Sequence, residues 1–194
     1  MAENSDSSNL LELFHGIQER LDTTNGSIKA DSWYVLVLSA LTASGKPGLA
    51  ADLYQHLISL PQYTSSDSRK MLMQRLRETL VKSVSVIGVA RPLEAVMCID
   101  TVTSEEDKDT SFSREHWKND EANHERGSSW LKKLYSDNLN PINEIFATQR
   151  DFGWISNEIM YGLYLSDHRI LDVVETEMVV LSGMIAQNLP RMTA

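Results

Sequence analysis

The feature that most constrains the fold is a segment, residues 31–43, in which nearly every position is apolar. A helix that is apolar on all sides needs a protein interior around it. The β-branched residues of this segment would also suit a buried strand. However, no second segment of the chain shows the alternation expected of a partner strand. We therefore predict a buried helix here and an all-α fold for the chain.

Apolar residues at helical spacing and the positions of glycine and proline predict the remaining helices. These helices are expected over residues 10–21, 47–60, 66–86, 91–98, 114–137, 141–147 and 154–165. Gly45 and Gly88 are expected to end helices. The last helix is predicted over residues 168–187, with Ser166 or Asp167 as its N-cap and Pro190 after its end.

The polar stretches of the chain suggest how it is organised. Residues 1–8 are polar and are predicted to form a disordered tail. Residues 9–194 are expected to form a single all-helical domain, a normal size for one domain. Within it, a charged linker over residues 101–113 joins two halves, at about 9–100 and 114–194. The two halves are expected to be related helical units.

Composition excludes some classes of partner and location. The formal net charge of −9 argues against nucleic acid and against an anionic membrane surface as the main partner. The N-terminus lacks the basic and apolar regions of a secretory signal. No apolar run approaches the roughly 18 residues that a membrane span requires. The single cysteine, Cys98, permits no intramolecular disulfide. We expect a cytoplasmic protein.

Two segments carry a resemblance to a known family. The first spans residues 33–96 and includes LTASGKPGLAADLYQHLISL and RLRETLVKSVSVIGVARPLEAV. The second spans residues 152–190 and includes VETEMVVLSGMIAQ. Together they resemble fungal-type members of the carboxymuconolactone decarboxylase / alkylhydroperoxidase D-like superfamily. VETEMVVLSGMIAQ is similar to that family's glutamate-bearing core helix, and GVARPLEAV is similar to its turn into a short helix. The resemblance covers about half of the chain.

This resemblance implies a compact helical bundle that assembles as a homo-oligomer. Redox members of the superfamily carry a Cys-x-x-Cys motif about a dozen residues after the core-helix glutamate. Here that place holds Leu189, Pro190, Arg191 and Met192, and the chain ends at Ala194, before the family's histidine. The resemblance therefore implies a member without thiol peroxidase chemistry.

Glu177 is the strongest candidate for a catalytic residue. It lies in the middle of an apolar stripe formed by Ile170, Val173, Val180 and Met184. A carboxylate in such a stripe must be paired, neutralised or functional, because its burial alone is costly. Burial would also raise its pKa and suit it to acid/base chemistry near neutral pH. The alternative is a structural carboxylate bound to an arginine or to a backbone group.

A second stripe, over residues 157–168, combines hydrogen-bonding aromatic side chains with an imidazole. We expect Tyr164 and His168 to orient the substrate or stabilise a developing oxyanion. Tyr161, Asn157 and Trp154 are expected to bind the substrate. The alternative is that this stripe is a polar flank at the rim of the core.

The other histidines considered for binding, and the single cysteine, lie outside these two stripes. His56 lies among leucines and is assigned to substrate binding, with a buried core histidine as the alternative. His116, Asp120 and His124 are spaced at four-residue intervals, but their segment is dense in charge. We interpret it as a solvated face rather than a metal site. Cys98 has an apolar context and is expected to behave as a small hydrophobic residue.

These observations lead to a functional hypothesis with two alternatives. We expect an enzyme of the lyase or isomerase type that needs no cofactor or metal. It would transfer protons on a small organic substrate in a decarboxylation, isomerisation or cyclisation. The first alternative is a non-catalytic oligomeric scaffold or ligand-binding protein. The second is a thiol peroxidase, which a single cysteine disfavours.

Overall fold

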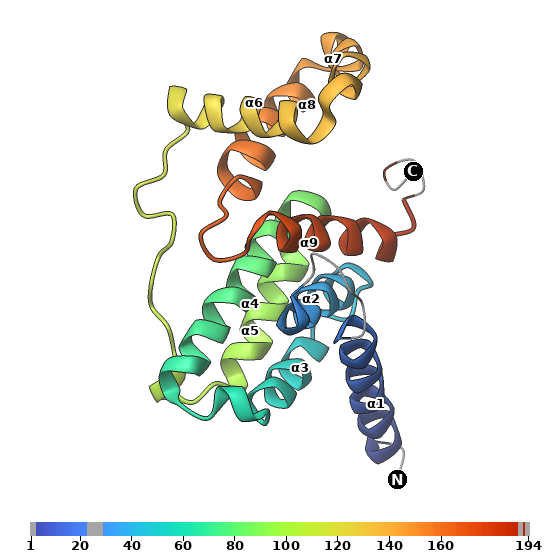
Figure 1. Ribbon diagram of the computed structural model, residues 1–194, viewed down its shortest axis with the longest axis vertical. Coiled ribbons are helices and arrows are strands. Elements are labelled where there is room, and N and C mark those ends of the chain that lie inside the picture. The colour runs from blue at the N-terminus through green and yellow to red at the C-terminus, as the bar shows by residue number, and fades with distance from the viewer. Residues whose placement is uncertain (1–2, 23–28, 190–191, 193–194) are drawn as a thin grey trace. The chain divides into compact units, whose positions relative to one another are not determined.

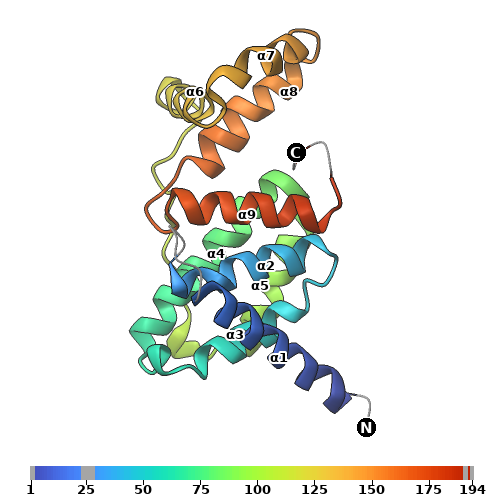
Figure 2. The same cartoon turned by 45° about the vertical axis from the view of Figure 1, so that its right-hand side comes forward.

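The computed structural model describes residues 3–22, 29–189 and 192, and every regular element within them is helical (Figures 1 and 2). The predicted all-α class is confirmed. Among the described residues, no helix combines the length and apolarity that crossing a bilayer would require.

The chain forms two compact units. Unit 1 consists of Met1–Asp109 together with Leu171–Ala194, and unit 2 is Thr110–Ile170. Unit 2 thus begins within the predicted linker, residues 101–113. The last helix, however, belongs to the same unit as the N-terminal helices.

Unit 1 is built around helix α2 (Trp33–Ala43), which corresponds to the apolar segment of the sequence. Val35 and Leu38 of α2 are fully buried, whereas Leu36, Ala40 and Leu41 are partly exposed. The predicted interior helix is therefore buried on most but not all of its sides. Helices α9 and α4 pack against α2 and against each other, and Figure 2 shows α9 running alongside α2. The helices of unit 1 are α1 (Glu3–Asp22), α2, α3 (Leu49–Ile58), α4 (Ser66–Ile87), α5 (Ala90–Val102) and α9 (Val173–Ala186).

Two glycines end segments of unit 1 as the sequence predicted. Gly45 follows α2 with φ of 81°, and Gly88 follows α4 with φ of 76°. Both angles are in the region that side chains other than glycine avoid. Helix α1 begins at Glu3, so it includes six residues of the stretch for which disorder was predicted. Met1 and Ala2 lie outside the described residues.

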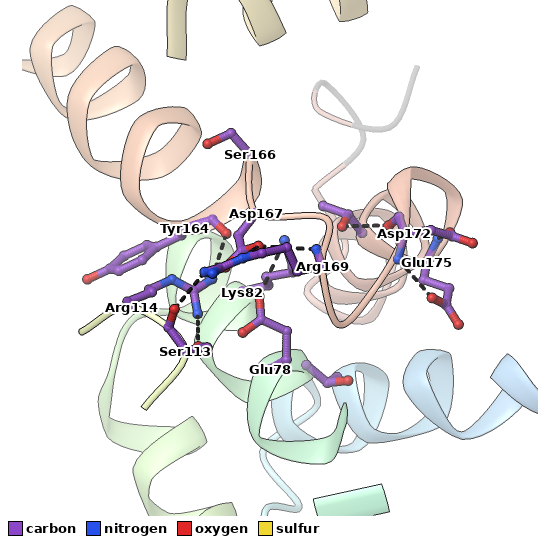
Figure 3. Close-up of polar contacts among 12 residues, drawn as sticks. Glu78, Lys82, Ser113, Arg114, Tyr164, Ser166, Asp167, Arg169, Asp172 and Glu175 are labelled. Atoms are coloured by element: carbon purple, nitrogen blue, oxygen red, sulfur yellow. Dashed lines mark hydrogen bonds and ion pairs between the residues drawn. The ribbon is translucent and has the colours of Figure 1, made fainter. Parts of the chain in front are cut away.

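The predicted start of the last helix was wrong. Helix α9 begins at Val173 and its N-cap is Asp172, not Ser166 or Asp167. The Asp172 side chain accepts a hydrogen bond from the Glu175 backbone N–H, and the Glu175 side chain accepts one from the Asp172 backbone N–H (Figure 3). This reciprocal capping box makes Asp172 the better start. Ser166 instead donates to the Gly162 carbonyl, and Asp167 pairs with Arg169.

Unit 2 pairs a helix with a π-helix. Its elements are α6 (Glu121–Tyr135), α7 (Leu139–Thr148), α8 (Arg150–Trp154) and the π-helix η5 (Ile155–Leu165). Helix α6 packs along η5, and Gly127 sets how close they come. A Cβ atom on Gly127 would lie 2.1 Å from the Asn157 carbonyl oxygen, so only glycine fits there. Helix α6 starts later than the predicted residue 114 because Asp120 caps it.

Candidate functional site

Helix α9 carries two glutamates with different surroundings, and the first, Glu175, is an anchored structural residue. Its buried carboxylate accepts hydrogen bonds from the Arg75 guanidinium and from the Ser32 hydroxyl. Arg75 also donates to the Tyr34 hydroxyl. Burial alone would raise the pKa of Glu175, but the bonds from Arg75 and Ser32 bring it below its usual value. Glu175 therefore remains ionised and ties α9 to α4 and to the start of α2.

Glu177, the predicted acid/base residue, has no such anchor. Its Oε1 atom is buried, and no described residue forms a hydrogen bond with it. Burial raises the pKa of Glu177, and the positive charge of Lys82 partly opposes this rise. An arginine, Arg75, holds Glu175. For Glu177, the assignment as the acid/base residue remains a prediction.

Lys82 completes a cluster of buried charges between α4 and α9. Its side chain is 0% exposed, and its ammonium lies 3.5 Å from the carboxylate of Glu78, one turn earlier on α4. We call Glu78, Lys82 and Glu177 the α4–α9 charge cluster. Lys82 thus interacts with carboxylates on both helices, by contact with Glu78 and through its charge with Glu177.

His56 lies at an aromatic cluster where α1 meets α3. Its buried ring packs against Phe14, His15 and Trp33, with centroid distances of 5.5, 5.1 and 5.9 Å. Burial, with a smaller effect of His15, lowers the pKa of His56, so the ring is neutral at neutral pH. His56 also lines a hollow of about 550 Å³ between α1 and α3. Its assignment to substrate binding remains a prediction.

The π-helix changes the polar stripe predicted over residues 157–168. Hydrogen bonds from i to i+5 widen the helix, so a stripe drawn for 3.6 residues per turn does not describe this segment. Tyr161 is buried and its hydroxyl lies 2.7 Å from the Tyr135 hydroxyl. Trp154 is exposed at the end of α8. His168 lies beyond the π-helix, and its ring packs on Trp130 at a centroid distance of 4.7 Å.

Backbone contacts hold the chain around Tyr164 in unit 2. The Arg114 guanidinium donates to the carbonyl oxygens of Leu163 and Tyr164, at 3.0 and 3.1 Å. Arg169 pairs with Asp167 and donates to the Ser113 carbonyl (Figure 3). Tyr164 and His168 thus belong to unit 2 and Glu177 to unit 1. The expectation that they act together remains a prediction.

Unit 2 also contains a polar cluster that the sequence did not predict. His124 Nδ1 lies 2.6 Å from Glu158 Oε1, and Ser128 Oγ lies 3.4 Å from His124 Nε2. Asn157 joins them: it donates to Glu158 Oε1 at 2.7 Å and accepts from Ser128 at 2.9 Å. The four-residue spacing of His124 and Ser128 was visible in the sequence. The contribution of Glu158 depends on how α6 packs on η5, which the sequence does not reveal.

His116, Asp120 and His124 do not share one helix. His116 precedes α6 and Asp120 is the N-cap of that helix, so only His124 of the spaced trio lies within it. In the part of the chain that the structure describes, no three histidine, cysteine or acidic side chains are grouped so as to hold a metal ion. Cys98 is a partly buried free thiol on α5.

Comparison of the chain with protein-family models, with curated proteins and with solved structures finds no match. The family resemblance drawn from the sequence therefore remains an expectation.

Proposed function

We propose that the protein is an enzyme that transfers a proton to or from a carbon atom of a small organic substrate, with Glu177 as the acid/base group. The observation that carries this proposal is the Oε1 atom of Glu177, which is buried without a hydrogen-bond partner among the described residues. A carboxyl whose pKa is raised by burial is a better base and a better acid near neutral pH than an ordinary glutamate.

Lys82 and Glu78 give the proposed acid/base group its electrostatic setting. The buried Lys82 charge offsets part of the cost of ionising Glu177, so the carboxyl can both release and take up its proton. Glu78 holds the Lys82 ammonium. This chemistry suits the deprotonation of a carbon next to a carbonyl group, the first step of many isomerisations and cyclisations. In the reverse direction, it suits protonation of the enolate left by decarboxylation.

The test follows exchange of carbon-bound hydrogen. A panel of small 2-oxo and 3-oxo acids is incubated with the protein in D₂O, and deuterium incorporation next to the carbonyl is followed by NMR. We expect Glu177→Gln to slow exchange by about 100-fold or more. The exposed Glu94 of α5 supplies the matched control, and Glu94→Gln should exchange at the wild-type rate. Wild-type exchange no faster than buffer across the panel, or full exchange by Glu177→Gln, would overturn the proposal.

A specific surface favours a second function, that of a homo-oligomeric scaffold. Helices α2 and α9 line a hollow of about 300 Å³ whose lining residues are Leu36, Ala40, Met178, Leu181, Ser182, Ile185 and Ala186. Leu181 and Ile185 are 47% and 65% exposed. None of the lining residues is charged, so this apolar face adds no like-charge repulsion when two copies meet.

Sedimentation velocity tests the scaffold function. If α2 and α9 join two copies, Ile185→Lys should convert the wild-type oligomer to a monomer. Met97 on α5 is similarly exposed, at 60%, and Met97→Lys is the matched control that should leave the oligomer intact. A wild-type monomer at micromolar concentration would contradict this second function.

A further inference from the structure

Three side chains of unit 2 stand in the order nucleophile, base, orienting acid. Ser128 Oγ lies 3.4 Å from His124 Nε2, and the opposite ring nitrogen, Nδ1, lies 2.6 Å from Glu158 Oε1. Nucleophilic hydrolases are recognised by this geometry and not by the order of the residues in the chain. We propose that Ser128, His124 and Glu158 form a second catalytic site that hydrolyses esters by acyl transfer. This activity is independent of the function proposed for Glu177.

Glu158 is the fixed member of the trio. Its buried carboxylate accepts hydrogen bonds from the amide groups of Asn157, at 2.7 Å, and Asn123, at 3.4 Å. Burial opposes its ionisation, but the bonds from His124 and Asn157 lower the pKa of Glu158 below its usual value. An ionised Glu158 can only accept at Oε1, so it places the imidazole proton on Nδ1. The Asn157 amide nitrogen, 3.0 Å from Nδ1, then donates to Glu158 and not to the ring. Nε2 of His124 is then the nitrogen that faces Ser128 as a base.

The close approach of α6 and η5 supports the position of Ser128. Gly127, its neighbour, allows the Asn157 backbone to reach α6, and the Asn157 side chain then accepts the Ser128 hydroxyl at 2.9 Å. The hydroxyl thus has two acceptors, Asn157 Oδ1 and His124 Nε2. Rotation about the Cβ–Oγ bond moves its proton from one to the other while Oγ itself stays in place.

The proposed reaction uses these groups in two half-reactions. Ser128 Oγ attacks the ester carbonyl carbon and its proton passes to His124 Nε2. The bond to the alcohol oxygen breaks, and the departing alcohol takes that proton, which leaves an acyl group on Ser128. Water then adds to the acyl carbon and gives a proton to His124. The bond to Oγ breaks, the acid leaves, and Ser128 regains its proton. The net reaction converts ester and water into acid and alcohol.

The surroundings of His124 define the class of ester. The His124 side chain is 53% exposed, so the site is open, which suits esters with small acyl groups and good leaving groups. Glu121 and Glu125 add negative charge around the imidazole. An anionic ester would be repelled by these carboxylates, so the site should prefer uncharged or cationic esters.

The test combines covalent labelling with kinetics on the full chain. The protein is treated with a fluorophosphonate, and the labelled residue is located by peptide mass spectrometry. Hydrolysis of p-nitrophenyl acetate is measured alongside. Ser129, next in sequence and exposed, provides the matched control. We expect label on Ser128 and a loss of hydrolysis of about 100-fold or more in Ser128→Ala and His124→Gln, with Ser129→Ala unchanged.

Two results would overturn the proposal. The first is a Ser128→Ala protein, folded by circular dichroism, that hydrolyses the ester at the wild-type rate, since His124 alone would then be the nucleophile. The second is a wild-type protein that takes no label and hydrolyses no faster than buffer. Ser128→Ala removes one hydroxyl from a partly exposed helical position and should fold. Hydrolysis that rises with pH and follows the titration of His124, measured separately by NMR, would support the assignment of the base.

Discussion

Glu175 and Glu177 lie two residues apart on helix α9, yet protein contacts shift their pKa values in opposite directions. Hydrogen bonds from Arg75 and Ser32 hold the pKa of Glu175 below its usual value, so this carboxylate stays ionised. Glu177 is partly buried beside Lys82, and its pKa is raised. The two residues should therefore respond differently to the same substitution.

Glu177→Gln should leave the protein at least as stable as wild type at pH 7. A carboxyl with a raised folded-state pKa contributes stability that is fully present below its unfolded value of 4.5 and is lost as pH rises through the folded value. Glutamine does not ionise, so the variant should gain stability relative to wild type as pH rises from 4.5. Urea unfolding at pH 4.5, 6 and 8 measures this difference. A variant less stable than wild type at pH 8 would show that Glu177 has an anchoring role.

Glu175→Gln should cost about 3–5 kcal/mol of unfolding free energy, because it leaves the Arg75 charge poorly compensated in a largely buried site. The lowered pKa of Glu175 contributes stability that is present above 4.5 and is lost as pH falls through the folded value. The penalty should therefore shrink in acid. Chemical unfolding at pH 7 and near pH 3 checks both statements. Arg75→Met combined with Glu175→Gln should cost less than the sum of the single changes.

Gly127→Ala should destabilise unit 2 by about 1–3 kcal/mol or more, because the new methyl group would collide with the Asn157 backbone. Around the corresponding position of Gly16 in helix α1, the described residues place no atom within 4 Å apart from the backbone of its own helix. Gly16→Ala should therefore raise stability, by about 0.5–1 kcal/mol, through helix propensity alone. Thermal unfolding followed by circular dichroism compares the two. Equal effects of the two alanines would argue against close packing of α6 on η5.

Protonation of His56 at acidic pH should weaken the packing of α1 against its ring. A buried imidazole with a lowered pKa contributes stability that is present above its unfolded value of 6.5 and is lost as pH falls through the folded value. His56→Leu should abolish this loss between neutral pH and about pH 5. Hydrogen exchange of the α1 amides, measured across that range for both proteins, tests it. Unchanged pH dependence in the variant would assign the effect to other groups.

The sequence predicted well those features that depend on local chemistry. The apolar segment predicted α2. Gly45 and Gly88 predicted the ends of α2 and α4, at Ala43 and Ile87. The start of α9 was predicted wrongly although a signal was present, because the Asp-x-x-Glu pattern at Asp172 and Glu175 is a capping box. The π-helix has no comparable sequence signal. The charge cluster of Lys82 with Glu177, and the contact of His124 with Glu158, join distant segments, so only packing could reveal them.

The division of the chain also bears on how the protein forms. Unit 1 is discontinuous, since its core closes only when α9 packs on α2, about 140 residues earlier in the chain. Unit 2 is continuous and can complete its contacts first. During synthesis, the apolar faces of α2 and α4 that pack against α9 stay exposed until α9 has left the ribosome. Newly made chains therefore pass through an interval in which chaperones can bind the N-terminal helices, and truncations that remove α9 should aggregate rather than fold.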